Sequence, residues 1–183
     1  RVGSSPSISC MALGFGAQNI VRDVLSGFFA VVEDQYGVGD TVDLGSDVKG
    51  TVEKINLRST RVRDVYGTVW HVPNGQILRV GNKSQEWARA LLDLEIPIDT
   101  DYDQARTLIQ SGADAVAAST EWSHEILSPP HVWGIESFGE GVYTVRLVVK
   151  TRPASQFGVM RALRIRIKQE FVAAGVRLPG GGR

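Results

Sequence analysis

The sequence is poor in the residues from which catalytic and metal sites are built. Its 183 residues include one cysteine, Cys10, and three histidines. A single cysteine excludes an intramolecular disulfide framework and fits a reducing compartment. His71, His124 and His131 are not at metal-ligand spacing from one another or from acidic clusters. We therefore expect no catalytic constellation, no metal and no cofactor, and predict that the protein is not an enzyme.

The chain also lacks net charge and long hydrophobic runs. Twenty Lys and Arg residues balance twenty Asp and Glu residues, so nucleic acid is not an expected partner. After the opening segment, the longest run of apolar or small residues, 24–32, is shorter than the roughly 20 residues that a spanning helix needs. The stretch 8–32 is long enough, but polar residues interrupt it: Gln18, Asn19, Arg22 and Asp23. It is either a broken helix that lines a wet space or a helix of a soluble domain.

The opening segment combines large apolar residues with small ones. Glycine inside a helix costs about 1 kcal/mol relative to alanine, so repeated glycines in an apolar helix indicate close backbone approach to a neighbour. Membrane helix bundles commonly show this arrangement. The small residues Cys10, Ala12 and Gly14 alternate here with Met11, Leu13 and Phe15.

Residues 35–87 form short β-segments separated by glycine and aspartate. We expect strands at 41–44 and 68–72 and a long β-rich run at 48–65. The alternation changes within the long run, which predicts a bulge or bend, and a bent strand suits a small barrel. A turn follows at 73–75, where proline presets φ. The pattern predicts a small closed β-barrel.

Residues 88–179 follow the order β-α-β-β-α-β of a ferredoxin-like α/β sandwich. In that topology the first and third strands are neighbours, which places Asp93 and Glu95 near Arg146 and Lys150. The first half is expected to contain a strand around 92–98 and a helix opened by a capping box at Asp101 and Gln104, with Ala105, Leu108, Ile109 and Val116 buried. The second half is expected to contain a hairpin of 132–138 and 142–151, a helix with Phe157, Met160, Leu163, Ile167 and Phe171 on its apolar stripe, and a last strand at 176–178.

Three arginines in the long β-rich run keep an alternative open. Arg58, Arg61 and Arg63 could bind RNA, because small barrels often do. The neutral net charge and the lack of interleaved aromatics weigh against this. The alternative interpretation is a soluble Sm-like module that binds RNA or peptide.

Taken together, these segments resemble the small-conductance mechanosensitive channel family. The resemblance extends from about Cys10 to Pro179, and its most specific element is the Pro-Asn-Gly turn after a strand. It is carried by Gly14-Phe15-Gly16-Ala17-Gln18-Asn19, Leu25-Ser26-Gly27-Phe28-Phe29, Gly39-Asp40-Thr41-Val42, Gly50-Thr51-Val52-Glu53 and Val72-Pro73-Asn74-Gly75-Gln76-Ile77.

The resemblance implies an α+β fold with a membrane helix. A pore-lining third transmembrane helix would occupy residues 10–34, a small Sm-like β-barrel residues 35–87, and the ferredoxin-like α/β sandwich residues 88–179. Residues 1–9 would be a linker or a cloning remnant and residues 180–183 a tail. The family's first two spanning helices are not recognised, so we expect the chain to be a piece of a longer protein.

The resemblance also implies a function. The expected activity is that of an ion channel opened by membrane tension, which releases ions and small osmolytes on hypo-osmotic shock. The expected assembly is a homo-oligomer, a heptamer, in the lipid bilayer of a prokaryotic plasma (inner) membrane. The barrel and the α/β domain would lie in the cytoplasm.

Family membership further implies roles for residues of the opening segment. Met11 and Phe15 match two large apolar residues, one turn apart, that form the closed pore constriction. A ring of such side chains can block ions by dewetting. Cys10, Ala12 and Gly14 match the small residues through which neighbouring pore helices pack.

Two further positions match points where the pore helix bends, and one motif belongs to the barrel domain. Asn19 stands where the family commonly has a glycine kink, and asparagine is a poor helix former. Gly27 matches a second flexible point. Pro73, Asn74 and Gly75 form the barrel-domain motif.

Overall fold

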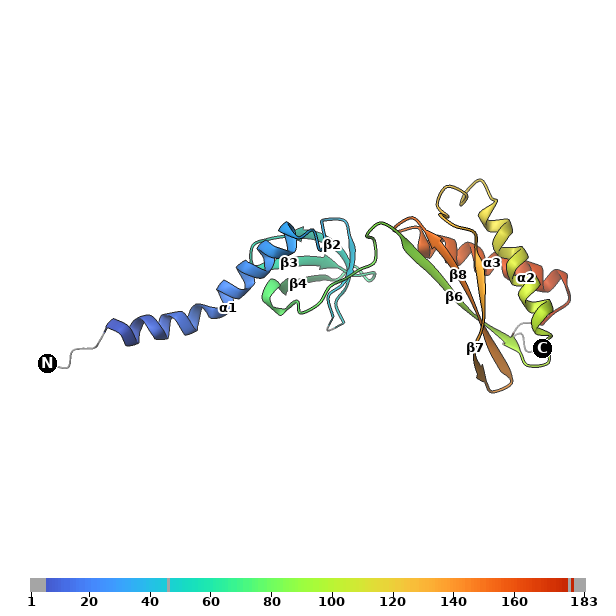
Figure 1. Cartoon of the computed structure of the whole chain (residues 1–183), viewed down its shortest axis with the longest axis horizontal. Coiled ribbons are helices and arrows are strands. Elements are labelled where there is room, and N and C mark those ends of the chain that lie inside the picture. Colours follow the sequence, from blue (N-terminus) through green and yellow to red (C-terminus); the bar gives the residue numbers. More distant parts are fainter. Residues whose placement is uncertain (1–5, 46, 178, 180–183) are drawn as a thin grey trace. The chain divides into compact units, whose positions relative to one another are not determined.

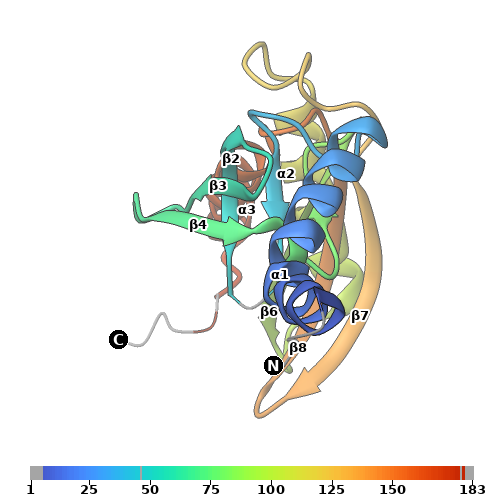
Figure 2. The same cartoon turned by 90° about the vertical axis from the view of Figure 1, so that its left-hand side faces the viewer.

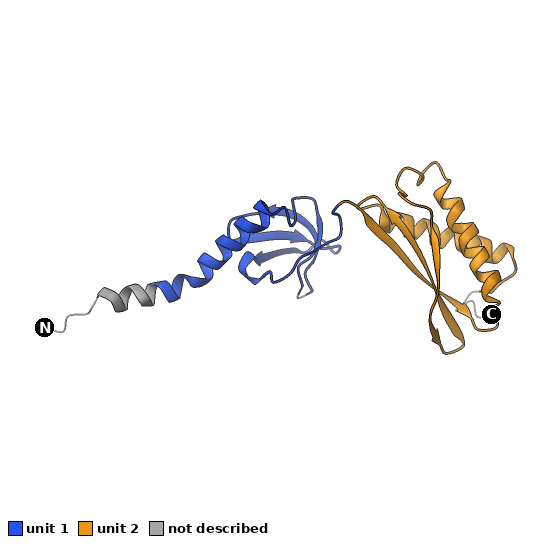
Figure 3. Cartoon of the chain, viewed as in Figure 1, with its two compact units in different colours: residues 1–85 blue, residues 86–183 orange. Residues whose placement is uncertain are grey.

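The chain divides into two compact units, unit 1 at residues 1–85 and unit 2 at residues 86–183 (Figure 3). The computed structural model describes residues 6–45, 47–177 and 179, with side chains described from Gly14 onward. Each unit has its own hydrophobic core.

Unit 1 joins one long helix to a small antiparallel sheet, called sheet A (Figure 1). Its strands lie in the order β4-β3-β2-β1-β5. The elements are α1 (Pro6–Val32), β1 (Thr41–Asp43), β2 (Lys49–Ile55), β3 (Ser59–Arg63), β4 (Val69–Pro73), the short 3-10 helix η1 (Asn74–Gln76) and β5 (Gly81–Asn82).

Helix α1 is continuous over 27 residues and passes through Asn19 and Gly27 without a break. Residues 10–34 were predicted to form a membrane helix, and α1 covers this range as far as Val32. Among the described residues, no helix combines the length and the apolar character that crossing a membrane requires. Polar residues divide the apolar sequence of α1: Gln18, Asn19, Arg22 and Asp23.

Sheet A is an open sheet, so the predicted closed barrel is wrong for this chain. Within the described strands, β4 pairs only with β3 at one edge and β5 pairs only with β1 at the other. Strand β5 has only two residues. Strand β4 ends at Pro73, which has no N–H to donate to a further ladder.

The long run predicted at 48–65 is two strands. β2 and β3 are antiparallel neighbours, and Asn56 N–H donates to Ser59 O at 2.9 Å across the turn between them. The predicted bulge lies in β2, where the register shifts between Val52 and Lys54. The reversal escaped prediction because an alternating pattern can continue through a tight hairpin without a glycine or proline to mark it.

The core of unit 1 lies between sheet A and the second half of α1. Figures 1 and 2 both show this half of the helix running alongside the sheet. Most of the side chains that face inward are alanine or valine, which suits a thin layer between one helix and one sheet, and Tyr36 and Leu44 are the larger exceptions. The inward-facing residues are Ala30, Tyr36, Val42, Leu44, Val48, Val52 and Val62.

Unit 2 packs two helices on one face of a three-stranded antiparallel sheet, called sheet B (Figure 1). Its order is β6-β8-β7, so the first and third strands of the predicted sandwich are neighbours, as expected. The elements are β6 (Ala88–Pro97), α2 (Tyr102–Ala117), β7 (His131–Gly139), β8 (Val142–Thr151) and α3 (Gln156–Ala173).

The predicted last strand at 176–178 does not form at Val176 and Arg177, and residue 178 lies outside the described residues. Gly175 ends α3 with a φ of 71°, a backbone conformation that glycine adopts readily.

The helices of unit 2 follow the predicted periodicity closely. Asp101 caps α2 by accepting a hydrogen bond from Gln104 N–H at 2.9 Å, as predicted. The predicted inner faces are correct except at Phe157, whose side chain is 50% exposed, whereas Val159 is fully buried. The core collects Ala90, Leu92, Ile96, Ala105, Ile109, Val145, Leu147, Val149, Leu163, Ile167 and Phe171.

Replacing Ile109 by alanine tests this core. Ile109 is fully buried, so Ile109→Ala should lower the free energy of unfolding of unit 2 by about 2–5 kcal/mol, since it removes apolar contacts and leaves a cavity. Ile165→Ala is the matched control, because Ile165 is 62% exposed on α3 and its loss should cost less than about 0.5 kcal/mol. Urea unfolding followed by far-UV circular dichroism measures both. Equal losses would contradict the assigned helix faces.

Candidate coupling site between helix α1 and sheet A

A turn after β4 brings the predicted Pro-Asn-Gly motif against α1. Pro73 has a φ of −58° and leads into η1, which begins at Asn74. Asn74 is 1% exposed, which is unusual for an uncharged polar side chain at a turn. Burial on this scale requires that its amide be hydrogen-bonded.

The Asn74 side chain fastens η1 to the β2–β3 turn. Its Nδ2 donates to Asn56 O and to Leu57 O, both at 3.0 Å. Its Oδ1 accepts from Thr60 Oγ1 at 2.9 Å, and its backbone N–H donates to Arg58 O at 2.9 Å. Both amide protons and the amide oxygen are therefore satisfied inside the protein.

The hydrogen-bond network continues to the segment that follows α1. Tyr36 OH lies 3.1 Å from Thr60 Oγ1. The single hydroxyl proton of Thr60 is given to Asn74, so the Tyr36 hydroxyl is the donor to Thr60. All three side chains are buried, and the network joins the end of α1, strand β3 and η1.

A buried carboxylate in the middle of α1 makes a second link to η1. Asp23 is 8% exposed, and its Oδ1 accepts a hydrogen bond from Gly75 N–H at 3.0 Å. Arg58 Nε lies 3.9 Å from Asp23 Oδ2. A carboxylate loses solvation when it is buried, so it needs these partners. The partners therefore fix the position of α1 against η1.

Two glycines allow this close approach of helix and turn. A Cβ atom on Gly27 would lie 2.6 Å from Leu57 O, and one on Gly75 would lie 2.7 Å from Asp23 Oδ1. Neither position has room for a side chain. Gly27, predicted as a flexible point, is here a helical residue in contact with Asn74, and its role as a hinge stays a prediction.

The Gly-Asp pair at 39–40 organises the loop between α1 and β1. Asp40 Oδ2 accepts from Gly37 N–H at 2.9 Å and from Asn82 Nδ2 at 2.8 Å, and Oδ1 accepts from Ser84 Oγ at 3.0 Å. Burial alone would raise the pKa of Asp40, but these hydrogen bonds outweigh it and the pKa is lowered. The carboxylate therefore stabilises the fold above its unfolded pKa, and this contribution is lost at lower pH.

An apolar groove runs beside the coupling site, between α1 and the β2–β3 turn. Its volume is about 810 Å³. The groove is lined by Val24, Gly27, Phe28, Val31, Val32 and residues 55–58. Phe28, Val31, Val32 and Leu57 are each more than half exposed, so unit 1 by itself leaves this apolar surface in contact with solvent.

The predicted pore residues fall on the first half of α1. The side chains of Cys10, Met11 and Ala12 lie outside the described residues. Phe15 is 75% exposed, and a Cβ on Gly14 would meet no described atom within 4 Å. The described part of unit 1 therefore leaves most of Phe15 uncovered and leaves space beside Gly14.

Of the residues predicted for function, the structure brings together Gly27, Asn74 and Gly75. Three others that complete the site were not predicted for it: Asp23, Tyr36 and Thr60. Asp23 gave a signal, because it is the one acidic residue in the sequence stretch 8–32. Tyr36 and Thr60 gave none, since a tyrosine after a helix and a threonine in a strand are ordinary there.

Asn74→Asp tests the amide network with an almost isosteric change. The carboxylate cannot donate to Asn56 O and Leu57 O, so unit 1 should lose about 1–3 kcal/mol and amide hydrogens at 56–60 and 69–77 should exchange faster. Asn56→Asp is the control, because the Asn56 side chain is exposed and the residue takes part in these contacts through its backbone N–H and oxygen. Hydrogen–deuterium exchange with mass spectrometry measures both; unchanged protection in Asn74→Asp would contradict the network.

Comparison with known protein families covers most of the chain. Residues 19–85 match the model of the mechanosensitive ion channel beta-domain. Residues 90–178 match the model of the C-terminal part of the mechanosensitive ion channel MscS. The two matches follow one another along the chain and together include both sheets.

Curated relatives of the chain are named mechanosensitive channels. The chain is 34% identical over 172 residues to a small-conductance mechanosensitive channel of Caldanaerobacter subterraneus subsp. tengcongensis; the match covers 94% of this chain and 60% of that protein. It is 28% identical over 169 residues to the moderate conductance mechanosensitive channel YbiO of Escherichia coli, with 92% of this chain and 23% of that protein covered. The chain thus spans 60% of the length of the first of these relatives and 23% of the second.

Solved structures show that the fold is shared. Helicobacter pylori MscS in its closed state superposes with a TM-score of 0.77 at 18% identity, over all of this chain and 73% of that one. Arabidopsis thaliana MSL1 superposes with a TM-score of 0.68 at 20% identity, over 94% of this chain and 63% of that one. With both of its units matched by models of one family, the chain belongs to the small-conductance mechanosensitive channel family.

Proposed function

We propose that the full-length protein is an ion channel opened by membrane tension, which releases ions and small osmolytes on hypo-osmotic shock. The observation that carries the proposal is the coupling site in a chain of this family. Asp23 and Gly27 hold α1 against Gly75 and Asn74, so a displacement of the helix strains buried hydrogen bonds in the sheet domain. Membrane tension that displaces α1 would therefore act against these hydrogen bonds.

The first half of α1 is proposed to line the pore. Met11 and Phe15, one helical turn apart, would form the constriction, and a ring of Phe15 side chains would exclude water when the pore is narrow. Cys10, Ala12 and Gly14 would lie against neighbouring copies of α1. The exposure of Phe15 supports this, because the described residues of unit 1 leave most of its side chain open to solvent.

Asn19 and Gly27 are proposed as the points at which α1 bends during gating. Asn19 is exposed and follows the proposed pore segment, so a bend there would leave the coupling site in place. Gly27 adjoins Asn74, so a bend there would loosen the amide network. A bend at Asn19 would thus move the pore segment alone, whereas a bend at Gly27 would also disturb the coupling site.

Assembly as a heptamer in the inner membrane of a prokaryote completes the proposal. The apolar groove and the exposed apolar residues of α1 support oligomer formation, since burial of such surface between copies is favourable. The lipid bilayer would contact the pore-helix region. An Sm-like sheet domain at 35–87 and a ferredoxin-like domain at 88–179 would lie in the cytoplasm.

Osmotic downshock of channel-deficient bacteria tests the proposed function. Cells that express the full-length protein should survive transfer to dilute medium, and excised membrane patches should show tension-gated current. Light scattering of the purified full-length protein should give the mass of seven copies. Absence of any tension-gated current in patches that contain the protein would overturn the proposal.

Phe15→Ser tests the proposed constriction. A hydroxyl at this position should wet the pore, so channels should open at lower tension and leak enough to slow growth. Phe157→Ser provides a control, because Phe157 is a 50% exposed phenylalanine on α3 and should leave the gating threshold unchanged. Patch-clamp recording measures the membrane tension at which half of the channels are open. An unchanged tension threshold in Phe15→Ser would contradict the role of Phe15 in the constriction.

A further inference from the structure

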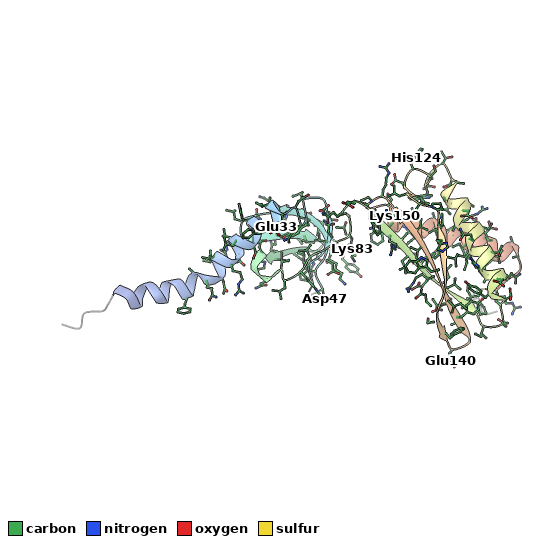
Figure 4. The ribbon with its side chains drawn as sticks, in the orientation of Figure 1. Glu33, Asp47, Lys83, His124, Glu140 and Lys150 are labelled. Carbon is green, nitrogen blue, oxygen red and sulfur yellow. The ribbon has the colours of Figure 1, made fainter. Side chains whose placement is uncertain are left out.

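The face of sheet B opposite α2 and α3 carries an unusual arrangement of charge. On this face β6 and β8 present side chains in successive cross-strand pairs. Asp93 lies opposite Arg146, Leu91 opposite Val148, and Arg89 opposite Lys150. Figure 4 labels Lys150, which lies at the end of the sheet where β6 begins.

The two charged pairs differ in how their charges are compensated. Arg146 donates to Asp93 through Nε at 2.7 Å and Nη2 at 2.8 Å, and through Nη1 to Glu136 at 2.9 Å. This confirms the predicted Asp93–Arg146 contact. Lys150, predicted near Glu95, instead lies opposite Arg89, because Glu95 pairs with Thr144.

Like charges directly opposite one another are destabilising in a sheet. Across the part of the chain that the structure describes, no carboxylate oxygen lies within 4.0 Å of a side-chain nitrogen of Arg89 or Lys150. Both side chains are exposed. The pair is therefore a local concentration of positive charge without an acidic partner.

Two tryptophans flank this pair and hold its cations in place. The Arg89 guanidinium carbon lies 5.3 Å from the centre of the Trp87 ring and 5.6 Å from that of Trp133. Lys150 Nζ lies 4.7 Å from the centre of the Trp87 ring. Such contacts use the ring faces and leave the N–H groups free to donate.

We propose that Trp87, Arg89, Trp133 and Lys150 form a binding site for a phosphoryl group, either inorganic phosphate or a small phosphate monoester. A guanidinium can donate two parallel hydrogen bonds to two phosphoryl oxygens, and an ammonium can donate to a third. A carboxylate group has only two oxygens, so the ammonium would have to share an oxygen with the guanidinium, and each carboxylate carries only one negative charge. A dianion also cancels the charge of the cross-strand pair. This site is independent of the proposed pore.

Tryptophan fluorescence of the full chain tests the site. Titration with inorganic phosphate and, separately, with glycerol 3-phosphate at constant ionic strength should give a saturable change in tryptophan emission. Trp133→Phe should remove much of the signal. Arg89→Gln and Lys150→Gln should each raise the half-saturating concentration at least about tenfold, since each removes a charged hydrogen-bond donor. Arg161→Gln makes an equal change of charge at an exposed position of α3 and should leave the half-saturating concentration unaltered.

The two phosphate probes separate the possible ligands. Tighter binding of glycerol 3-phosphate would identify an ester site, and tighter binding of phosphate an inorganic one; either supports the proposal. Equal binding of succinate would overturn the assignment to a phosphoryl group. A signal that persists in the Arg89→Gln, Lys150→Gln double variant, or no saturable change, would overturn the site itself.

Discussion

The buried amide of Asn74 is the interaction on which unit 1 depends. One side chain satisfies two carbonyls of the β2–β3 turn and the hydroxyl of Thr60, and through Thr60 it reaches Tyr36 beyond the end of α1. An unmade hydrogen bond in this position would leave a buried polar group unpaired, which costs more than the bond itself contributes. The turn, the strand and the helix therefore keep one relative arrangement.

The two units cover their small sheets in different ways. Sheet B is covered on one face by two amphipathic helices and holds a continuous aliphatic core. Sheet A has one helix, a smaller core and a polar network beside it. Unit 2 thus relies mainly on apolar burial, whereas the position of α1 on unit 1 is specified by a few directional contacts.

What the sequence could predict follows from the range of the interactions involved. The helices α2 and α3 and the Asp101 cap depend on residues three or four apart, and their inner faces were predictable except at Phe157. The pairing of β6 with β8 followed from topology. The closed barrel was wrong because edge pairing depends on where β4 and β5 end. The partners of Asn74 come from segments 14 to 18 residues earlier in the chain, and no local pattern identifies them.

Helix α1 has the geometry of a lever with its pivot off centre. At 1.5 Å per residue its 27 residues extend over about 40 Å, and about 25 Å of this precedes Asp23. A tilt of about 5° at the Asp23–Gly75 contact moves the first turn by about 2 Å, while atoms next to the pivot move by a few tenths of an ångström. Hydrogen bonds at the pivot can survive a movement that, at the far end, exceeds the length of a carbon–carbon bond.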